Sequence, residues 1–147
     1  MKVGEIVKSY IILKEAKLTK MEDADKFKVI RAMREMRPVV EKYSNDEKEA
    51  IEKLEDEEYK SALDKAVRHN NALKEGDESA ILSHEELKDI QSYFEKVDKS
   101  KNECIKELQE EEKDLNFEKI SQEALYKLIV SNDFIVGQMF DLECTLC

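Results

Sequence analysis

The sequence predicts an all-α protein, folded as an antiparallel helical bundle with a long helical hairpin. Of its 147 residues, 41% are charged and 41% are hydrophobic, whereas only three are glycine and one is proline. So few glycines and prolines cannot supply the tight turns of a sheet-rich fold, while Glu, Lys, Leu and Ala favour helices. At this length we expect one helical domain, residues 1–147, with a core of modest size.

Capping signals indicate where the helices begin and end. A Ser or Thr followed three residues later by Glu can satisfy two backbone N–H groups at a helix start. Three such pairs occur: Thr19 with Glu22, Ser44 with Glu47, and Ser83 with Glu86. Ser121 has the apolar flanks of a helix start, and Gly76 stands where a helix can end in a left-handed residue. The predicted helices cover residues 3–17, 20–43, 46–74, 84–112, 122–131 and 134–145.

The second predicted helix contains the only proline and most of the methionines. Pro38 lacks an N–H and its ring crowds the preceding turn, so we expect a kink there. The apolar residues of this helix are assigned to the core, and an adaptable groove for a partner helix is the alternative. They are Met21, Phe27, Ile30, Met33 and Met36.

A minor two-stranded β-ribbon is predicted between residues 77–83 and 114–119. Leu115 and Phe117 alternate with polar residues in the second segment, as a half-buried strand requires. Such a ribbon is marginal on its own and needs packing support from the helices.

The helix predicted at 84–112 carries the clearest periodic signal. Its seam positions, with Lys101 between Val97 and Cys104, recur at alternating spacings of three and four, which is typical of a coiled-coil packing seam. The seam consists of Leu87, Ile90, Phe94, Val97, Cys104 and Leu108. The helix at 46–74 follows the same pattern less regularly, so we expect the two helices to form an antiparallel hairpin. A homo-oligomeric coiled coil through the same seam is the alternative.

Charge is distributed unevenly along the chain. Residues 1–43, the predicted N-terminal helices, carry 11 basic and 7 acidic side chains, a net charge of +4. Residues 44–147, the predicted hairpin (44–112) and the short C-terminal helices (113–147), carry 14 and 28, a net charge of −14. An acidic surface repels nucleic-acid backbones and attracts basic proteins, so a protein partner with a basic surface is expected, and direct binding of nucleic acid is not.

Two acidic runs are the candidate partner-binding residues. They consist of Glu55, Asp56, Glu57 and Glu58, and of Glu110, Glu111 and Glu112. Consecutive carboxylates on a helix can imitate phosphates against a basic groove, and the alternative interpretation is a solvated helix face.

The residue patterns of common catalytic and cofactor sites do not occur in the sequence. The glycines are isolated, so no phosphate-binding loop is predicted. Neither histidine follows a glutamate by three positions, as helical di-iron sites require. Cys144 and Cys147 form a C-x-x-C pair, but a zinc site needs two further ligands. We therefore predict no catalytic residue, no bound metal and no cofactor.

One carboxylate pattern suggests an enzymatic alternative. Glu55-x-x-Glu58 followed by Glu86-x-x-Asp89 resembles the all-α nucleoside triphosphate pyrophosphohydrolases related to MazG. In that family four acidic side chains from two adjacent helices hold Mg²⁺, for which hard oxygen ligands are suited. The resemblance implies Mg²⁺-dependent hydrolysis of a nucleoside triphosphate.

The layout of the whole chain resembles small acidic proteins of unknown function encoded by tailed phages and prophages. Basic helices are followed by a long acidic hairpin, then by residues 115–121 (LNFEKIS) and by residues 132–138 (NDFIVGQ). The resemblance implies a non-enzymatic phage protein with protein partners, either an accessory of virion assembly or an inhibitor of a host defence protein. It implies no catalytic residue.

Signals for export or membrane insertion do not occur. The longest apolar run, residues 10–13, is far shorter than the roughly 20 residues that span a bilayer. Charged residues interrupt the segment where an apolar signal core would stand. Three cysteines cannot all pair within one chain, which favours a reducing compartment. We therefore expect a cytoplasmic protein.

Overall fold

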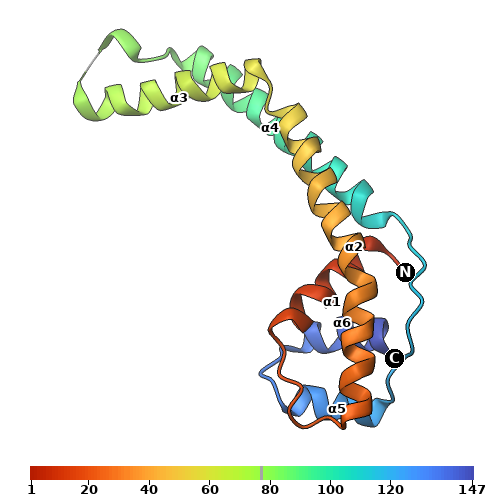
Figure 1. Ribbon diagram of the computed structural model, residues 1–147. Coiled ribbons are helices and arrows are strands. Elements are labelled where there is room, and N and C mark those ends of the chain that lie inside the picture. Colours follow the sequence, from red (N-terminus) through yellow and green to blue (C-terminus); the bar gives the residue numbers. More distant parts are fainter. Residues whose placement is uncertain (77) are drawn as a thin grey trace. The chain divides into compact units, whose positions relative to one another are not determined.

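The computed structural model describes residues 1–76 and 78–147 and confirms the all-α fold class (Figure 1). Its described residues form six α-helices, one short 3-10 helix and no strand, apart from an isolated bridge between Lys2 and Glu112. The helices are α1 (Val3–Glu15), α2 (Asp23–Leu54), α3 (Glu57–Glu75), the 3-10 helix (Glu78–Ala80), α4 (His84–Glu110), α5 (Gln122–Val130) and α6 (Val136–Leu146).

The chain divides into two compact units. Residues 1–45 and 107–147 form the first, which we call the core unit, and residues 46–106 form the second, the hairpin unit. The boundaries lie close to those of the predicted hairpin, and they fall inside α2 and α4. The segments that precede and follow the hairpin in sequence therefore fold together.

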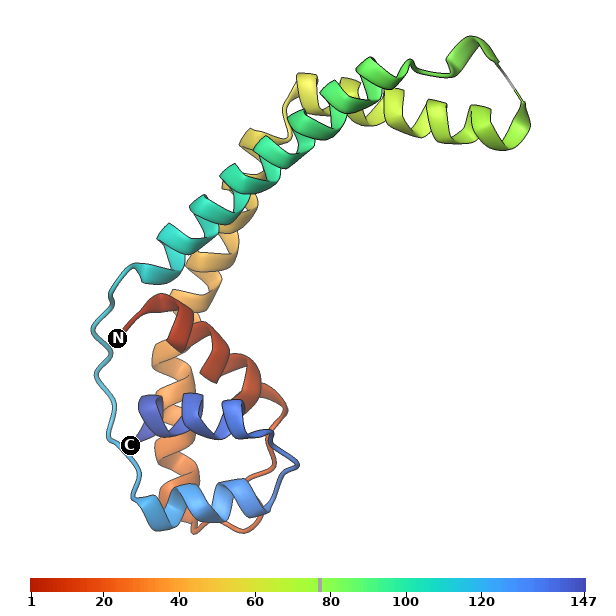
Figure 2. The same cartoon turned by 180° about the vertical axis from the view of Figure 1, so that it is seen from behind.

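The core unit holds the main hydrophobic core. In both views α1 lies beside α6, and the extended segment after α4 runs along the unit to α5 (Figures 1 and 2). Ile120 at the end of this segment is buried, and Leu115 and Phe117 pack against the same core. The buried apolar side chains of the cluster are Ile6, Ile12, Leu13, Met21, Val29, Ala32, Met36, Ile120, Ala124, Leu125, Leu128, Leu142 and Leu146.

Hydrogen bonds fix the chain segments of the core unit to one another. The Val3 N–H donates to the Glu111 carbonyl at 2.8 Å, and the Lys113 N–H donates to the Met1 carbonyl at 2.9 Å. The Ser9 hydroxyl donates to the Asp141 carbonyl at 3.1 Å and lies 2.7 Å from the Thr145 hydroxyl. Residues from opposite ends of the sequence thus satisfy each other's polar groups.

The hairpin unit contains the end of α2, the whole of α3 and most of α4, and α3 and α4 are antiparallel neighbours, as predicted (Figure 2). Tyr59 meets Phe94 edge to face with ring centroids 5.4 Å apart. Near the turn, the Leu82 N–H donates to Nδ1 of His69 at 2.9 Å. Few of its described side chains are fully buried, namely His69, Ala72 and Val97.

Three of the predicted helix boundaries are confirmed by their capping bonds. The Glu86 N–H donates to the Ser83 hydroxyl at 3.2 Å, and the Ser83 N–H donates to the Glu86 carboxylate at 3.3 Å. Ser121 accepts from the Ala124 N–H at 3.1 Å. Gly76 ends α3 with φ of 75°, a backbone conformation that glycine adopts without steric cost.

Two predicted boundaries are wrong. Thr19 lies in a turn, and α2 begins only at Asp23. Ser44 lies within α2, which continues to Leu54, because the segment after Ser44 contains no glycine or proline and residues 47–54 are mostly good helix formers. The actual break comes at Asp56, whose carboxylate accepts from the Tyr59 N–H at 3.0 Å.

The helix α2 continues through Pro38 and does not stop near Met36. One further prediction needs correction. The β-ribbon is wrong over the described residues: Glu78–Ala80 is a 3-10 helix, and residues 114–119 form no strand. Leu115 and Phe117 instead pack against the hydrophobic core. Asp77, the first residue of the predicted ribbon, lies outside the described residues.

The core assignment of the α2 residues is correct in part. Met21 and Met36 are buried, and Met33 packs against the core. Phe27 and Ile30 are instead exposed, because α2 turns a different face, with Val29 and Ala32, toward the core. None of the described helices is at once long enough and apolar enough to cross a bilayer.

Candidate functional site

The first acidic run, residues 55–58, lies at the junction of α2 and α3. Glu55 is half-buried, and its carboxylate accepts from the Lys101 ammonium of α4 at 2.7 Å. The same ammonium stands 4.8 Å from the centroid of the Tyr59 ring, a cation–π arrangement. The hydrogen bond to Glu55 is the main reason that the pKa of Lys101 is raised. The Glu55 carboxylate therefore holds the α2/α3 junction to α4 and is not free for a partner.

The next three residues present their charge toward solvent. Asp56 caps α3, Glu58 is exposed, and the Glu57 side chain is 94% exposed, with a long ion pair of 3.5 Å to Lys60. Burial, followed by the charges of Asp56 and Glu58, raises the pKa of the Tyr93 phenol on α4. The start of α3 is thus a region of negative potential that extends to the neighbouring helix.

The second acidic run, residues 110–112, lies in the core unit, and two of its three carboxylates pair with lysines. The Glu110 carboxylate accepts from the Lys2 ammonium, and this bond is the main reason that the pKa of Lys2 is raised. The Glu111 carboxylate pairs with Lys113. Glu112 forms the isolated β-bridge with Lys2. These contacts join the segment after α4 to the start of the chain, and they leave the first run as the more available acidic surface.

The predicted seam on α4 is only partly covered. Val97 is buried, whereas Leu87, Ile90, Phe94, Cys104 and Leu108 are half-buried. On α3, Leu63 and Val67 lie one turn apart on one helix face, and they are 45% and 48% exposed. The packing of the hairpin unit therefore leaves apolar area uncovered on α3 and α4, which a further helix could bury.

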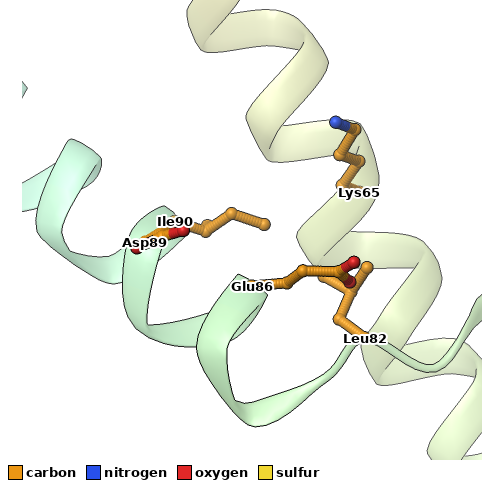
Figure 3. Close-up of a pocket in the computed structure, with 5 residues that line it drawn as sticks. All are labelled: Lys65, Leu82, Glu86, Asp89 and Ile90. Atoms are coloured by element: carbon orange, nitrogen blue, oxygen red, sulfur yellow. The ribbon is translucent and has the colours of Figure 1, made fainter.

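A hollow of about 360 Å³ lies near the turn of the hairpin (Figure 3). It is lined by Lys65, Leu82, Glu86, Asp89 and Ile90. Glu86 already accepts the Ser83 N–H as part of its capping box. Figure 3 shows the Lys65 ammonium and the Glu86 carboxylate pointing in different directions, so the polar groups do not converge on one point.

The four carboxylates of the enzymatic alternative are not brought together. Glu55 pairs with Lys101 and Glu58 lies near Tyr93, whereas Glu86 and Asp89 lie in the first turns of α4. A helix rises about 1.5 Å per residue, so the stretch of α4 from Asp89 to Lys101 holds Glu55, the partner of Lys101, beyond ligand distance of Asp89. Over residues 1–76 and 78–147, no three His, Cys, Asp or Glu side chains are grouped to hold a metal ion.

The histidines and cysteines occupy separate places. His69 is buried and accepts a backbone hydrogen bond, and His84 is exposed at the start of α4. Cys104 is half-buried in the seam, while Cys144 and Cys147 are exposed on and after the last turn of α6. Although Cys147 is exposed as a residue, partial desolvation of its thiol, followed by the charge of Glu143, raises the pKa of that thiol, which disfavours the reactive thiolate.

An apolar groove between α5 and α6 was not predicted from the sequence. Its volume is about 230 Å³, and its lining residues are Gln122, Leu125, Ile129, Val136, Met139, Phe140 and Glu143. Tyr126, Val130 and Ile135 are also exposed. The available signal was that α6 places apolar residues on more than one face, with Asp141 and Glu143 as its only charged residues. A helix buried on one side leaves the others exposed.

Comparison of the chain with protein-family models, with curated proteins and with solved structures finds no significant match.

Proposed function

We propose that the protein is a non-catalytic binding protein whose acidic hairpin docks against a basic surface of a partner protein. The observation that carries this proposal is the exposed carboxylate group at the start of α3, formed by Asp56, Glu57 and Glu58. The hairpin unit as a whole has 18 acidic and 11 basic residues, a net charge of −7. A concentrated negative field of this kind accelerates association with a basic partner and suppresses binding to acidic ones.

The layout resemblance to phage proteins gives two concrete versions of this role. In one, the partner is a phage protein and the chain is an accessory of virion assembly. In the other, the partner is a host defence protein whose basic surface is blocked by the hairpin. Both versions take place in the cytoplasm of the host cell and involve protein contacts without direct binding of nucleic acid or membrane.

The experiment is capture of partners from host lysate by the full chain at low and at high salt. The test variant is E57K/E58K, in which two solvent-facing charges are reversed and the residues of the Asp56 cap and the Glu55–Lys101 pair are kept, and circular dichroism checks that the helix content is unchanged. The control variant E15K/E35K makes the same change in net charge at exposed positions of the core unit. We expect wild type and control to retain a basic protein at low salt, and E57K/E58K to lose it. The proposal is contradicted if the wild-type chain retains no protein from the lysate. It is also contradicted if the amount of retained protein changes neither with salt nor in E57K/E58K.

The half-covered seam favours a second candidate, a homo-oligomeric coiled coil formed through the hairpin. The exposed Leu63 and Val67 would be covered by the hairpin of another copy. Light scattering at high concentration tests this candidate, because a coiled-coil oligomer should dissociate in the variant L63Q/V67Q. A monomeric wild type removes it.

A further inference from the structure

Two exposed surfaces of the core unit complement each other in shape and charge. The first is a ridge on α2 formed by Phe27, Ile30, Arg31 and Arg34, whose spacing of i, i+3, i+4 and i+7 places them on one helix face. Phe27 is 62% exposed and Ile30 is 43% exposed, and both arginines are exposed. The ridge therefore combines apolar anchors with adjacent positive charges.

The second surface is the apolar groove between α5 and α6. Its lining includes the apolar Ile129, Met139 and Phe140 and one carboxylate, that of Glu143. The connection between α5 and α6 adds the exposed Asp133, and α6 contains no basic residue. The one lysine of α5, Lys127, is engaged by Glu22 at 3.1 Å and by Glu123 at 3.5 Å. The groove is thus apolar, with Glu143, which accepts from Gln122 at 3.2 Å, as its lining carboxylate and Asp133 in the adjoining connection. We call these two carboxylates the acidic border.

We propose that the α5/α6 groove binds the α2 ridge of a second copy of this chain. Phe27 and Ile30 enter the groove as apolar anchors, and Arg31 and Arg34 face the acidic border, in the manner of an amphipathic helix that binds in a groove. Met139 adapts to the shape of the incoming side chains because the thioether chain is flexible.

The charges of the two surfaces and the packing of α2 indicate that a second copy of the chain occupies the groove. A groove-to-groove dimer would bring two acidic borders together, whereas groove-to-ridge docking pairs opposite charges. The ridge cannot fill the groove of its own chain, because the buried Val29, Ala32 and Met36 fix α2 against the core and the ridge cannot move to that groove. The net charge of −10 opposes association only weakly at about 0.15 M salt, where the Debye length is about 8 Å. The contact is head-to-tail, since two different surfaces meet.

The test is sedimentation of the full chain, from micromolar to millimolar concentration, in reducing buffer so that the exposed cysteines stay free. The ridge variant R31E/R34E and the groove variant D133K/E143K reverse the two sets of charges. Each alone should self-associate at least about tenfold more weakly than wild type, because like charges then face each other. An equimolar mixture of the two variants should associate again, because the acidic ridge of one fits the basic border of the other.

Matched controls separate this contact from general charge effects and from the hairpin seam. The variant K8E/K14E changes the net charge as R31E/R34E does, at exposed positions on α1, and should associate like wild type. A wild type that is monomeric at every concentration overturns the proposal and leaves the groove to another protein. Association that survives R31E/R34E, or that is lost in L63Q/V67Q instead, overturns it as well.

Discussion

At the scale of single residues, Ser9 and Thr145 form the most deeply buried polar contact of the core unit. Both residues are fully buried, and their hydroxyl oxygens lie 2.7 Å apart. The Ser9→Ala variant leaves the Thr145 hydroxyl without this partner, so we expect the free energy of unfolding to fall by about 1–3 kcal/mol. Urea denaturation measures the loss. If the cost of S9A combined with T145V equals the sum of the two single costs, the hydroxyls are not coupled and the contact is misassigned.

The Lys101 ammonium makes a second residue-scale prediction, on pH dependence. Its hydrogen bond to Glu55 raises the folded-state pKa of Lys101 above the ordinary value of 10.5. A raised pKa means that the folded state holds the proton more tightly, so this contribution is complete below pH 10.5 and is lost as pH rises through the folded-state pKa. Unfolding measured on the alkaline side should therefore show the wild type converging on K101M. A constant difference between the two proteins would show that the pair contributes nothing to the pH dependence.

At the scale of elements, Asp56 both caps α3 and contributes to its acidic surface. Because the Asp56 carboxylate accepts the Tyr59 N–H, Asp56→Ala should lower the free energy of unfolding by about 1 kcal/mol. Asp56→Asn keeps an accepting oxygen, so its stability should stay within a few tenths of a kcal/mol of wild type. Chemical denaturation of both variants checks this. Equal losses in the two would indicate that the charge of Asp56, and not its cap, stabilises the junction.

The same helix boundaries show what sequence could predict. Ser83 with Glu86, Ser121 and Gly76 were identified correctly because each signal lies beside a real change in apolar pattern. Ser44 is also followed by a glutamate three residues later, but α2 continues through it because no glycine or proline interrupts the helix there. A serine can cap a helix, but it can also lie inside one. The β-ribbon failed because alternation shows that Leu115 and Phe117 share a face without showing what covers it.

The sequence could predict a candidate binding surface only where that surface is formed by charged residues close together in the chain. The exposed Glu57 and Glu58 follow directly from the sequence, whereas the partners of Glu110 and Glu111, at the other end of the chain, do not. The α5/α6 groove depends on which apolar residues remain after two helices pack, and this is a property of the tertiary structure.

At the scale of the whole molecule, burial is distributed unequally between the two units. The core unit has a cluster of fully buried side chains, whereas few described side chains of the hairpin unit are fully buried. Local opening free energies follow such differences, so the amides of α3 should exchange with solvent faster than those of α1 and α6. Hydrogen exchange read by mass spectrometry measures this. Equal protection in the free chain would show that the hairpin is more stable than its burial indicates.

The central claim is that the hairpin acts through its negative surface on a basic partner. The most direct measurement is the association rate constant of the chain with its captured partner as a function of ionic strength. We expect the rate constant to fall steeply with salt for wild type and E15K/E35K, and to be low and nearly flat for E57K/E58K, because steering acts on association more than on dissociation. An association rate constant that is independent of salt in wild type would contradict the claim.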